Sequence, residues 1–344
     1  METSIIHNAI KEQMQLGVTN AGTEYLHVGL AGTENYIPHI GMVMMSLLSF
    51  NPKVKFMFHL FLGNISKVEL KRLESVAKDS DCIIKVYVIN DDFFGDVVNG
   101  MYTASFFYRF IMPDVVVNDT DRLIYMDGDM MCHGDISDIG SLELNSNMAA
   151  VVTDRDEKRQ MEQLQVQHFF NSGMMVINVK KWVRENFLKQ VLDFSRESMN
   201  KMDSNGRVKE WRNARYNDQN VLNKLLNGQV VYLYGQVVYL SKKYNYVYKL
   251  NRSALFRRKA YNEDYKEQII LHFAGSVKPW HEWVQDWPVV KEYREIWRNS
   301  PWKDVPVTKP VSRKDFHQAA REYRVTGRYG KSFKNYWEYY RRKL

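Results

Sequence analysis

The chain has 344 residues, 45% of them hydrophobic and 26% charged, which is enough for a large folded domain and excludes a largely disordered protein. Its net charge of +8 predicts an anionic partner, such as a phosphorylated ligand, a membrane surface or nucleic acid. Two cysteines, Cys82 and Cys132, are too few for a disulfide framework and indicate a reducing compartment.

The N-terminal segment, residues 1–22, is polar and is interpreted as an extension of the folded domain. It lacks the apolar core and basic flank of a signal peptide. The longest apolar run, residues 40–50, is about three helical turns long and therefore too short to cross a bilayer. We expect a cytoplasmic protein that contacts a membrane only peripherally.

Strands and helices then alternate along the chain. Apolar runs and helix caps predict strand 26–31, helix 38–50, strand 55–62, helix 66–78 with Ser66 as its N-cap, strand 83–89, helix 105–112 ending before Pro113, and strand 122–126. This order predicts an α/β fold with a mainly parallel sheet and helices on both faces. Ligands bind beyond the carboxyl ends of such strands, which places a site at the loops after Ala31 and Met126.

The second half of the chain continues this pattern and then changes in composition. Strands are expected at 149–152, 174–179 and 269–273, and a helix at 218–226. After Trp287 the chain becomes rich in Trp, Tyr, Arg and Lys. We therefore expect an α/β domain at residues 23–287 and a basic, aromatic C-terminal region with a helical tail at residues 288–344.

The segment RLIYMDGDM carries the strongest local signal. Asp127 and Asp129 flank Gly128 directly after an apolar strand. Side chains two residues apart in an extended segment project to the same side, and two carboxylates placed in this way repel each other unless a cation lies between them. Oxygen ligands suit Mg²⁺ or Mn²⁺, and Gly128 lets a ligand approach the backbone closely. The alternative is a surface turn, since Asp and Gly favour turns.

The segment HFAGSVKPW, residues 272–280, begins at the end of a short apolar strand. His272 is a candidate third metal ligand through an imidazole nitrogen, and mixed oxygen and nitrogen ligands favour Mn²⁺ over Mg²⁺. Lys278 supplies a point charge suited to a diphosphate, and Gly275 permits a tight turn whose N–H groups face phosphate. The alternative is a buried core histidine and a solvated lysine.

With FFNSGMMVINVKKW between them, these motifs resemble glycosyltransferase family 8, and the resemblance covers residues 25–305. It implies a GT-A fold (the Rossmann-like fold of nucleotide-diphospho-sugar transferases), a UDP-sugar donor, Mn²⁺ with Mg²⁺ as the alternative, and retention of the anomeric configuration. Within the family the chain looks most like the lipopolysaccharide core α-glucosyl- and α-galactosyltransferases. This implies UDP-glucose or UDP-galactose as donor and the lipopolysaccharide core as acceptor.

The resemblance assigns the nucleotide side of the site. The metal ligands and diphosphate contacts of the family match Asp127, Asp129, His272, Gly275 and Lys278. Ala31 and Tyr36 match the uridine loop, where Tyr36 would stack on uracil. Many relatives carry Asp in place of Thr33, whose hydroxyl is expected to take over that contact. Gly128 replaces a more usual apolar residue or Ala and is expected to leave more room over the ribose.

The resemblance also assigns the sugar side of the site. The matching positions are Arg109 in FFYRF, Asp154 in VVTD, Asn171 in FFNSG, and Asp218 and Gln219 in YNDQN. Gln219 is expected near the anomeric carbon. For Arg109 the alternative is a structural ion pair, for Asn171 a turn, and for Gln219 a helix surface. Asp156 is a rival to Asp154.

Two routes lead to retention of configuration. One needs a nucleophile on the β face, where the Gln219 amide oxygen is weakly basic and Asp218 is chemically better. The other is same-face attack, in which the departing phosphate oxygen takes the proton of the acceptor. We favour same-face attack. The chain is alternatively a family member acting on another surface glycan or a glycoprotein, or a metal-dependent sugar-nucleotide hydrolase.

The tail concentrates the positive charge. From residue 313 onward there are ten cations, three acids and eight aromatic residues, an excess of seven positive charges. Because a nucleic-acid-binding protein should carry such a patch on the fold itself, we expect no nucleic acid as partner. Cations and aromatics together predict docking on the anionic cytoplasmic face of the inner membrane. The alternative is a solvated basic helix packed on the catalytic domain.

Overall fold

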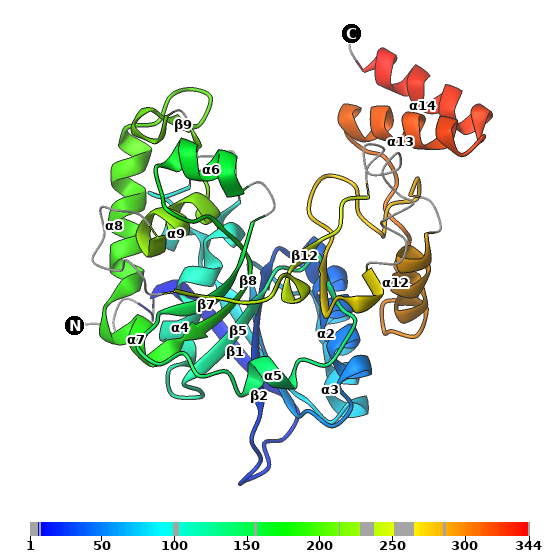
Figure 1. The fold of residues 1–344 in the computed structure, drawn as a ribbon. Helices are drawn as coiled ribbons and strands as arrows, with labels where there is room; N and C mark the ends of the chain where they lie inside the picture. The colour runs from blue at the N-terminus through cyan, green and yellow to red at the C-terminus, as the bar shows by residue number, and fades with distance from the viewer. Residues whose placement is uncertain are drawn as a thin grey trace.

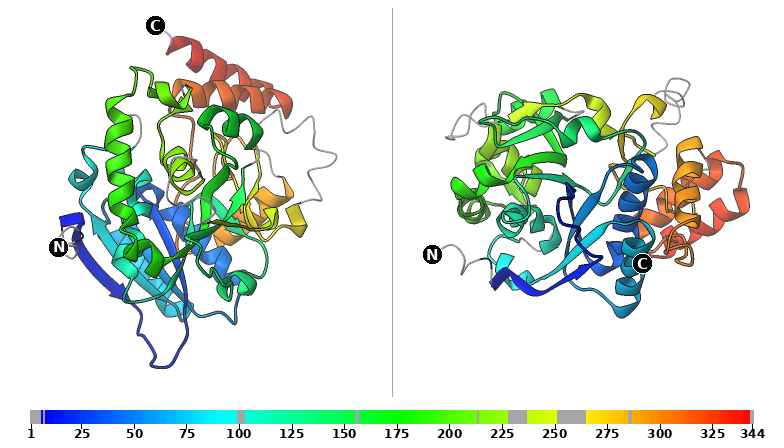
Figure 2. Two further views of the ribbon diagram at one scale, coloured as in Figure 1. Left: turned by 60° about the vertical axis from the view of Figure 1, so that its left-hand side comes forward. Right: turned by 90° about the horizontal axis from the view of Figure 1, so that it is seen from below.

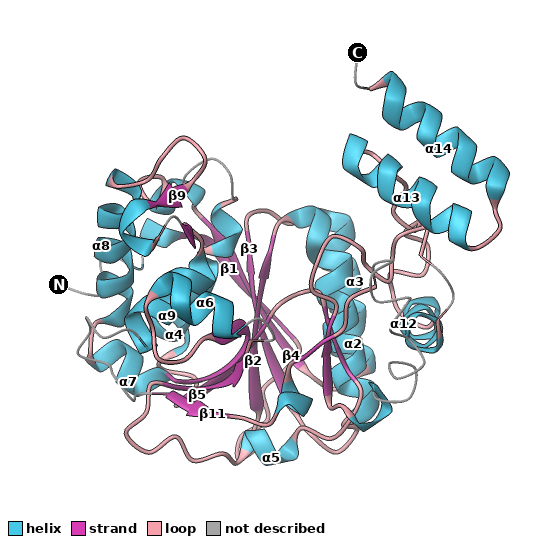
Figure 3. Cartoon of the chain, turned by 45° about the horizontal axis from the view of Figure 1, so that its top comes forward, coloured by secondary structure: helices cyan, strands magenta, loops and turns pink. Residues whose placement is uncertain are grey.

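The computed structural model describes residues 6, 8–98, 103–154, 157–212, 214–227, 237–250, 265–284 and 287–342. A central sheet of eight strands has the order β1-β4-β3-β2-β5-β8-β7-β11 (Figures 1 and 3). Its strands are β1 (Ile10–Leu16), β2 (Leu26–Gly32), β3 (Phe56–Leu62), β4 (Ile83–Ile89), β5 (Arg122–Met126), β7 (Ala149–Thr153), β8 (Phe170–Asn178) and β11 (Val237–Tyr239). Strands β2 to β5 are parallel, whereas β8 runs antiparallel to both β5 and β7. The prediction of a mainly parallel sheet is confirmed.

Helices cover both faces of this sheet and bury two hydrophobic cores. The first core lies under α2 (Ile37–Phe50) and α3 (Lys67–Asp79), and the Ser66 hydroxyl caps α3 by accepting from the Glu69 N–H. The second lies under α4 (Met112–Val116), α7 (Val179–Arg184), α8 (Phe187–Asn200) and α9 (Asp218–Asn227), on the opposite side in Figure 1. Two short helices, α5 (Ser137–Gly140) and α6 (Glu157–Leu164), lie in the connections.

The helix expected at 105–112 is wrong. The segment instead forms two 3₁₀ turns, Ala104–Phe106 and Tyr108–Phe110, followed by α4, which has Pro113 in its first turn. Proline lacks a backbone N–H, and the first turn of a helix leaves its N–H groups without an intrahelical partner, so proline suits the start of a helix. Pro113 therefore begins a helix here, and Arg109 lies in a short turn ahead of it.

The N-terminal segment contributes an edge strand to the sheet. Strand β1 pairs antiparallel with β4, and Ile10, Met14 and Leu16 are half-buried between exposed polar residues. An edge strand with one wetted face needs few apolar side chains, which explains the polar composition of residues 1–22. Residues 1–5 and His7 lie outside the described part of the chain.

Beyond Trp287 the chain continues as α12 (Pro288–Arg298), α13 (Arg313–Val325) and α14 (Tyr329–Arg341). Trp302 anchors this region on the first core, since its indole N–H donates to Glu69 over 2.7 Å and its ring lies against Gly41 of α2. The pair α13 and α14 lies outside α12, away from the sheet (Figures 1 and 2). No helix in the described part of the chain is both long and apolar enough to cross a membrane.

Candidate active site

The candidate site is a cavity of about 480 Å³ at the carboxyl ends of β2 and β5, where the sequence placed it. Its lining consists of Ala31, Gly32, Thr33, Tyr36, Thr103, Ser105, Phe106, Arg109, Tyr125, Asp127, Gly128, Asp129, Ser172, Asp218, Gln219 and Lys278. Ten of the residues expected from the sequence are in this set. Asn171 and His272 are buried beside it, Asp154 is bonded to Asn171, and Gly275 lies in an exposed loop with a φ of +106°.

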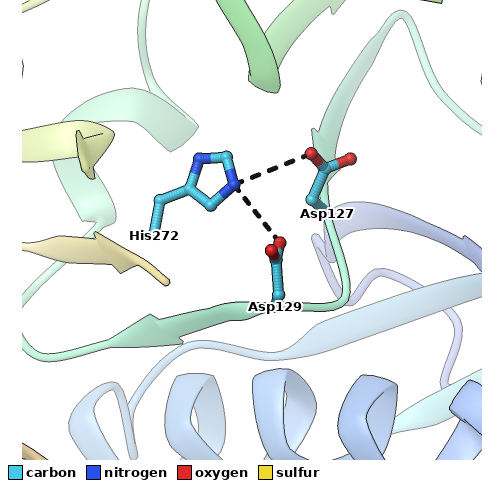
Figure 4. A group of neighbouring side chains, drawn as sticks. All are labelled: Asp127, Asp129 and His272. Atoms are coloured by element: carbon cyan, nitrogen blue, oxygen red, sulfur yellow. Dashed lines mark ion pairs between the residues drawn. The ribbon is translucent and has the colours of Figure 1, made fainter. Parts of the chain in front are cut away.

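Asp127, Asp129 and His272 form a candidate site for a divalent metal. The His272 Nε2 atom lies 3.3 Å from Asp129 Oδ1 and 3.9 Å from Asp127 Oδ2, and one ligand atom from each residue lies within 4.8 Å of the others (Figure 4). A second sheet brings them together, in which β13 (Ile270–His272) pairs antiparallel with β6 (Met130–Cys132), directly after Asp129. Two carboxylates and an imidazole nitrogen are a donor set that fits Mn²⁺.

The His272 ring is oriented by Asn245, a residue that the sequence analysis missed. His272 Nδ1 lies 3.0 Å from Asn245 Oδ1, and because an amide oxygen only accepts, the ring proton is on Nδ1. The Nε2 atom therefore faces the two carboxylates, and once it gives up its proton its lone pair is placed to bind a metal. Asn245 precedes β12 (Tyr246–Val247), which pairs with β13. The sequence YNY carries no local signal for this role, because the contact exists only once β12 and β13 are side by side.

The same hydrogen-bond chain continues to two residues expected on the sugar side. Asn245 Nδ2 donates to Asn171 Oδ1 over 2.9 Å, and Asn171 Nδ2 donates to Asp154 Oδ2 over 3.0 Å. Asn171 is the second residue of β8, so the turn interpretation is wrong. The rival Asp156 lies outside the described residues.

Gly173 is required by the close approach of two candidate metal ligands. A Cβ atom at this position would lie 2.6 Å from His272 Cε1, 2.8 Å from Asp127 Oδ2 and 2.9 Å from Met130 Cε. In addition, the Asp127 N–H donates to the Gly173 carbonyl over 2.7 Å. The glycine of the NSG motif thus makes room for the metal site.

Arg109 is a buried cation that joins the metal site to α9. Its Nη2 lies 3.0 Å from Asp127 Oδ1 and 3.0 Å from Asp218 Oδ2, while Nη1 donates to the Ser172 carbonyl over 2.9 Å. Its guanidinium lies 4.3 Å from the centre of the Tyr125 ring. Arg109 therefore forms structural ion pairs and also lines the cavity.

Asp218 and Gln219 begin α9, and their side chains reach the cavity. Burial raises the pKa of Asp218 above its ordinary value, against the opposing charge of Arg109. Gln219 Oε1 accepts from the Ser172 N–H over 3.1 Å, and this bond to β8 holds the Gln219 side chain in position. Gln219 is thus a cavity residue and the helix-surface interpretation is wrong.

Lys278 completes the charged cluster. Its Nζ lies 2.5 Å from Asp129 Oδ2 and donates to the Phe273 carbonyl over 2.8 Å. Burial alone would raise the pKa of the Asp129 carboxyl, but the positive charges of His272 and Lys278 outweigh it and hold that pKa below its ordinary value. Asp129 is therefore ionised near neutral pH, as a metal ligand must be.

The expected extra room at Gly128 is already filled. A Cβ atom on Gly128 would lie 2.8 Å from the Tyr36 ring and 3.1 Å from Ile40 Cγ1. The glycine admits the Tyr36 ring, so the prediction of space over a ribose is wrong. Tyr36 itself lines the cavity, and Thr33 is exposed beside it.

Comparison with known proteins gives concordant results. The family model of glycosyl transferase family 8 matches residues 27–284, and that of the glycosyl transferase family 8 C-terminal region matches residues 287–343. The chain is 26% identical over 333 residues to the lipopolysaccharide glucosyltransferase WaaO of Escherichia coli, covering 94% of this chain and 93% of that protein. It is 26% identical over 320 residues to the lipopolysaccharide 1,3-galactosyltransferase of Salmonella typhimurium, covering 90% and 89%.

Among solved structures, an active-site mutant of LgtC aligns with a TM-score of 0.64 at 18% identity, covering 80% of this chain and 96% of that one. The predicted GT-A fold is confirmed by this likeness.

Proposed function

The chain belongs to glycosyl transferase family 8, and from this we propose that it moves glucose or galactose from a UDP-sugar to the core oligosaccharide of lipopolysaccharide, in an α linkage and with retention of configuration. The proposed hexoses and acceptor follow the two relatives in Escherichia coli and Salmonella typhimurium, which are a lipopolysaccharide glucosyltransferase and galactosyltransferase. Both are matched over about nine-tenths of their length.

The observation that carries the proposal is the charged cluster of Asp127, Asp129, His272 and Lys278 at the cavity. Two carboxylates and an imidazole with its Nε2 free to coordinate suit Mn²⁺, with Mg²⁺ as the alternative, and Lys278 adds a cation beside them. A divalent cation bound there would supply positive charge that offsets the negative charge growing on the departing diphosphate. We assign the diphosphate to this cluster and the Gly275 loop.

We assign the remaining parts of the donor to the other cavity residues. Uridine is assigned to Ala31, Thr33, Tyr36 and Gly128, and the hexose to Arg109, Asp154, Asn171, Asp218 and Gln219. The Asp218 carboxylate is held in an ion pair with Arg109, so it is not free to attack the anomeric carbon. This supports same-face attack, in which the acceptor hydroxyl attacks the anomeric carbon from the face that UDP leaves and gives its proton to the departing phosphate oxygen.

We further propose that the tail binds the anionic cytoplasmic face of the inner membrane. Large side chains at intervals of three or four residues form an exposed stripe along α14: Tyr329 (70% exposed), Phe333 (76%), Trp337 (56%) and Tyr340 (61%). Aromatics settle at the headgroup level, and each nearby cation adds roughly 1 kcal/mol on an anionic surface. Most of the tail's cations lie on α13 and α14, whereas Lys343 is outside the described residues.

The function is tested by incubating the protein with a panel of UDP-sugars and rough lipopolysaccharide acceptors, with and without Mn²⁺. We expect Mn²⁺-dependent transfer of glucose or galactose to the acceptor, with the product linkage determined by NMR. A hydrolase would release free hexose at the same rate whether or not an acceptor is present. Transfer only to a different glycan or to a glycoprotein would contradict the proposed acceptor and keep the reaction class.

The membrane proposal is tested by changing the stripe itself. The double variant Phe333→Ser/Trp337→Ser should lose most binding to anionic vesicles at low salt and keep transfer to a soluble acceptor. Val68→Ser, at an exposed apolar position on α3, is the matched control. Substitution is preferable to removal of α13 and α14, because α13 contacts the Gly275 loop, where Gln318 Nε2 donates to Ser276 Oγ over 2.6 Å. Unchanged vesicle binding by the double variant would refute the anchor.

A further inference from the structure

A second cavity, of about 500 Å³, lies next to the candidate active site. It is an open cavity lined by α6, by the start of α9 and by a small hairpin of β9 (Arg207–Val208) and β10 (Ala214–Arg215). Figure 1 shows these three elements together at one end of the molecule. The lining consists of Arg159, Gln160, Gln163, Arg207, Arg212, Arg215, Asn217, Gln219 and Asn220. Four of these nine side chains are arginines, and none of the nine is acidic.

Two of the arginines stand directly opposite each other. In the antiparallel pairing of β9 and β10, Arg215 is the partner of Arg207. Like charges in directly opposed positions destabilise a pair of strands. Within the part of the chain that the structure describes, neither guanidinium has a carboxylate within ion-pair distance. The nearby Asp203, in the turn before β9, uses its carboxylate to accept from the backbone N–H groups of Asn205 and Arg207. An anion between the two guanidinium groups would relieve this repulsion.

The hairpin that carries these arginines is anchored on the domain. Val208 and Ala214, the neighbours of the two arginines, are buried, as is Tyr216, whose hydroxyl donates to the Val97 carbonyl over 2.8 Å. Since alternate residues of a strand face opposite ways, Arg207 and Arg215 face outward. Arg212 ties the hairpin to α6 by donating from Nη1 to the Glu162 carbonyl over 3.0 Å. The hairpin thus fixes the backbone positions from which the arginines line the cavity.

Gln219 connects this cavity to the chemistry, because it lines both cavities. In the proposed function Gln219 lies near the anomeric carbon, and the donor diphosphate is assigned to Lys278 and the metal site. A group bound among the arginines would therefore approach the reacting carbon without being part of the donor. The only other substrate of the reaction is the acceptor.

We propose that this arginine cavity is the acceptor subsite and that it binds an anionic group, a phosphate or a carboxylate, carried by the acceptor glycan. Guanidinium groups bind both kinds of oxyanion with paired, charge-assisted hydrogen bonds. The inference rests on the proposed function and names the acceptor chemistry that the site selects. The arginines come from α6, the hairpin and the turn between its strands, so the cluster forms only on folding.

The test uses rough lipopolysaccharide core oligosaccharide in three forms: untreated, dephosphorylated with a phosphatase, and with its carboxylates reduced to alcohols. Binding to the full chain is measured by calorimetry with UDP and Mn²⁺ present. We expect one of the two treatments to weaken binding to the unaltered protein at least tenfold, which identifies the anion. Arg207→Gln/Arg215→Gln should bind all three forms about equally and weakly. Arg184→Gln, an exposed arginine on α7, should behave like the unaltered protein.

The stability of the double variant separates binding from folding. Because it removes a repulsive pair, its melting temperature should stay the same or rise, and Arg215→Gln alone serves if the double variant does not fold. Equal binding of the three forms by the unaltered protein, absence of binding, or normal binding by the variants would overturn the inference. Charge-dependent binding without hexose transfer would support an anion-binding subsite at the arginines and reject the proposed function. Transfer that ignores the charge of the acceptor would do the reverse.

Discussion

Replacing Gly173 by alanine should weaken metal binding by a predictable amount. The new Cβ would lie 2.6 Å from His272 Cε1 and 2.8 Å from Asp127 Oδ2, whereas ordinary contacts begin near 3.4 Å. One or both ligands must therefore move by several tenths of an ångström, and a metal site tolerates only about 0.2 Å in its ligand distances. Disturbing the orientation of metal ligands typically lowers affinity about 10- to 100-fold, or roughly 1.4 to 2.7 kcal/mol.

The variant also overpacks the interior, so a control must share that cost. Inserting a methyl group into a packed core destabilises by about 1 to 3 kcal/mol. Gly29→Ala, on β2, is the control, because its Cβ would lie 2.9 Å from Met112 Sδ and 3.2 Å from Leu123 Cδ2 without touching a ligand. Both variants should lose a similar free energy of unfolding in urea. Only Gly173→Ala should lose affinity for Mn²⁺, measured by electron paramagnetic resonance or calorimetry. Equal Mn²⁺ affinity in the two variants would refute the reasoning.

Further changes have equally definite outcomes. Asp129→Asn removes a charge and an oxygen ligand, so Mn²⁺-dependent turnover of the UDP-sugar should be lost with the fold intact; unchanged turnover would contradict the metal site. Asn245→Ala should weaken Mn²⁺ binding about tenfold or more, and Asn245→Asp, which still accepts from the imidazole, should recover part of it. Gln219→Ala should lower kcat far more than it weakens calorimetric UDP binding, because the proposed function assigns this side chain to the hexose and not to the nucleotide. His27 is stacked on His59, and burial lowers its pKa to about 4. The unfolded chain takes up this proton near pH 6.5, so His27 alone should lower the stability of the folded state by up to roughly 3 kcal/mol as pH falls from 6.5 to 4, and His27→Gln should reduce that slope in urea unfolding.

Most of the sheet could be predicted from the sequence because its strands are buried on both faces. Strand β3 is fully buried from Phe56 to Leu62, and apart from His59 it is a continuous apolar run whose ends are easy to recognise in the sequence. The edge strand β1 could not be recognised in the sequence because about half of its side chains are polar and exposed to solvent. The helix boundary at Pro113 was predicted wrongly for a different reason. Proline is found both just after a helix and in its first turn, and only packing decides between these two positions.

Some residues of the candidate site could be predicted from local motifs, and others could not. Asp127, Asp129 and His272 stand in short, recognisable segments and could be found. Asn245 could not, because its only distinguishing property is a contact with a residue 27 positions away. The Arg207 and Arg215 pair was equally hidden, since the repulsion between them depends on the register of a hairpin and not on any local pattern.

The NSG motif owes its composition to the direction of β8. This strand runs antiparallel between β5 and β7, so its first residues lie at the carboxyl ends of its neighbours, beside the candidate site. Its pairing with β7 shifts at that point, since Val151 is opposite Met175 but Val152 is opposite Asn171. The bulge frees the Ser172 N–H for Gln219, and the next residue must be glycine because two metal ligands approach it. Three consecutive residues thus contact Asp154, Gln219 and two candidate metal ligands, which explains why so short a segment carries so much of the candidate site's geometry.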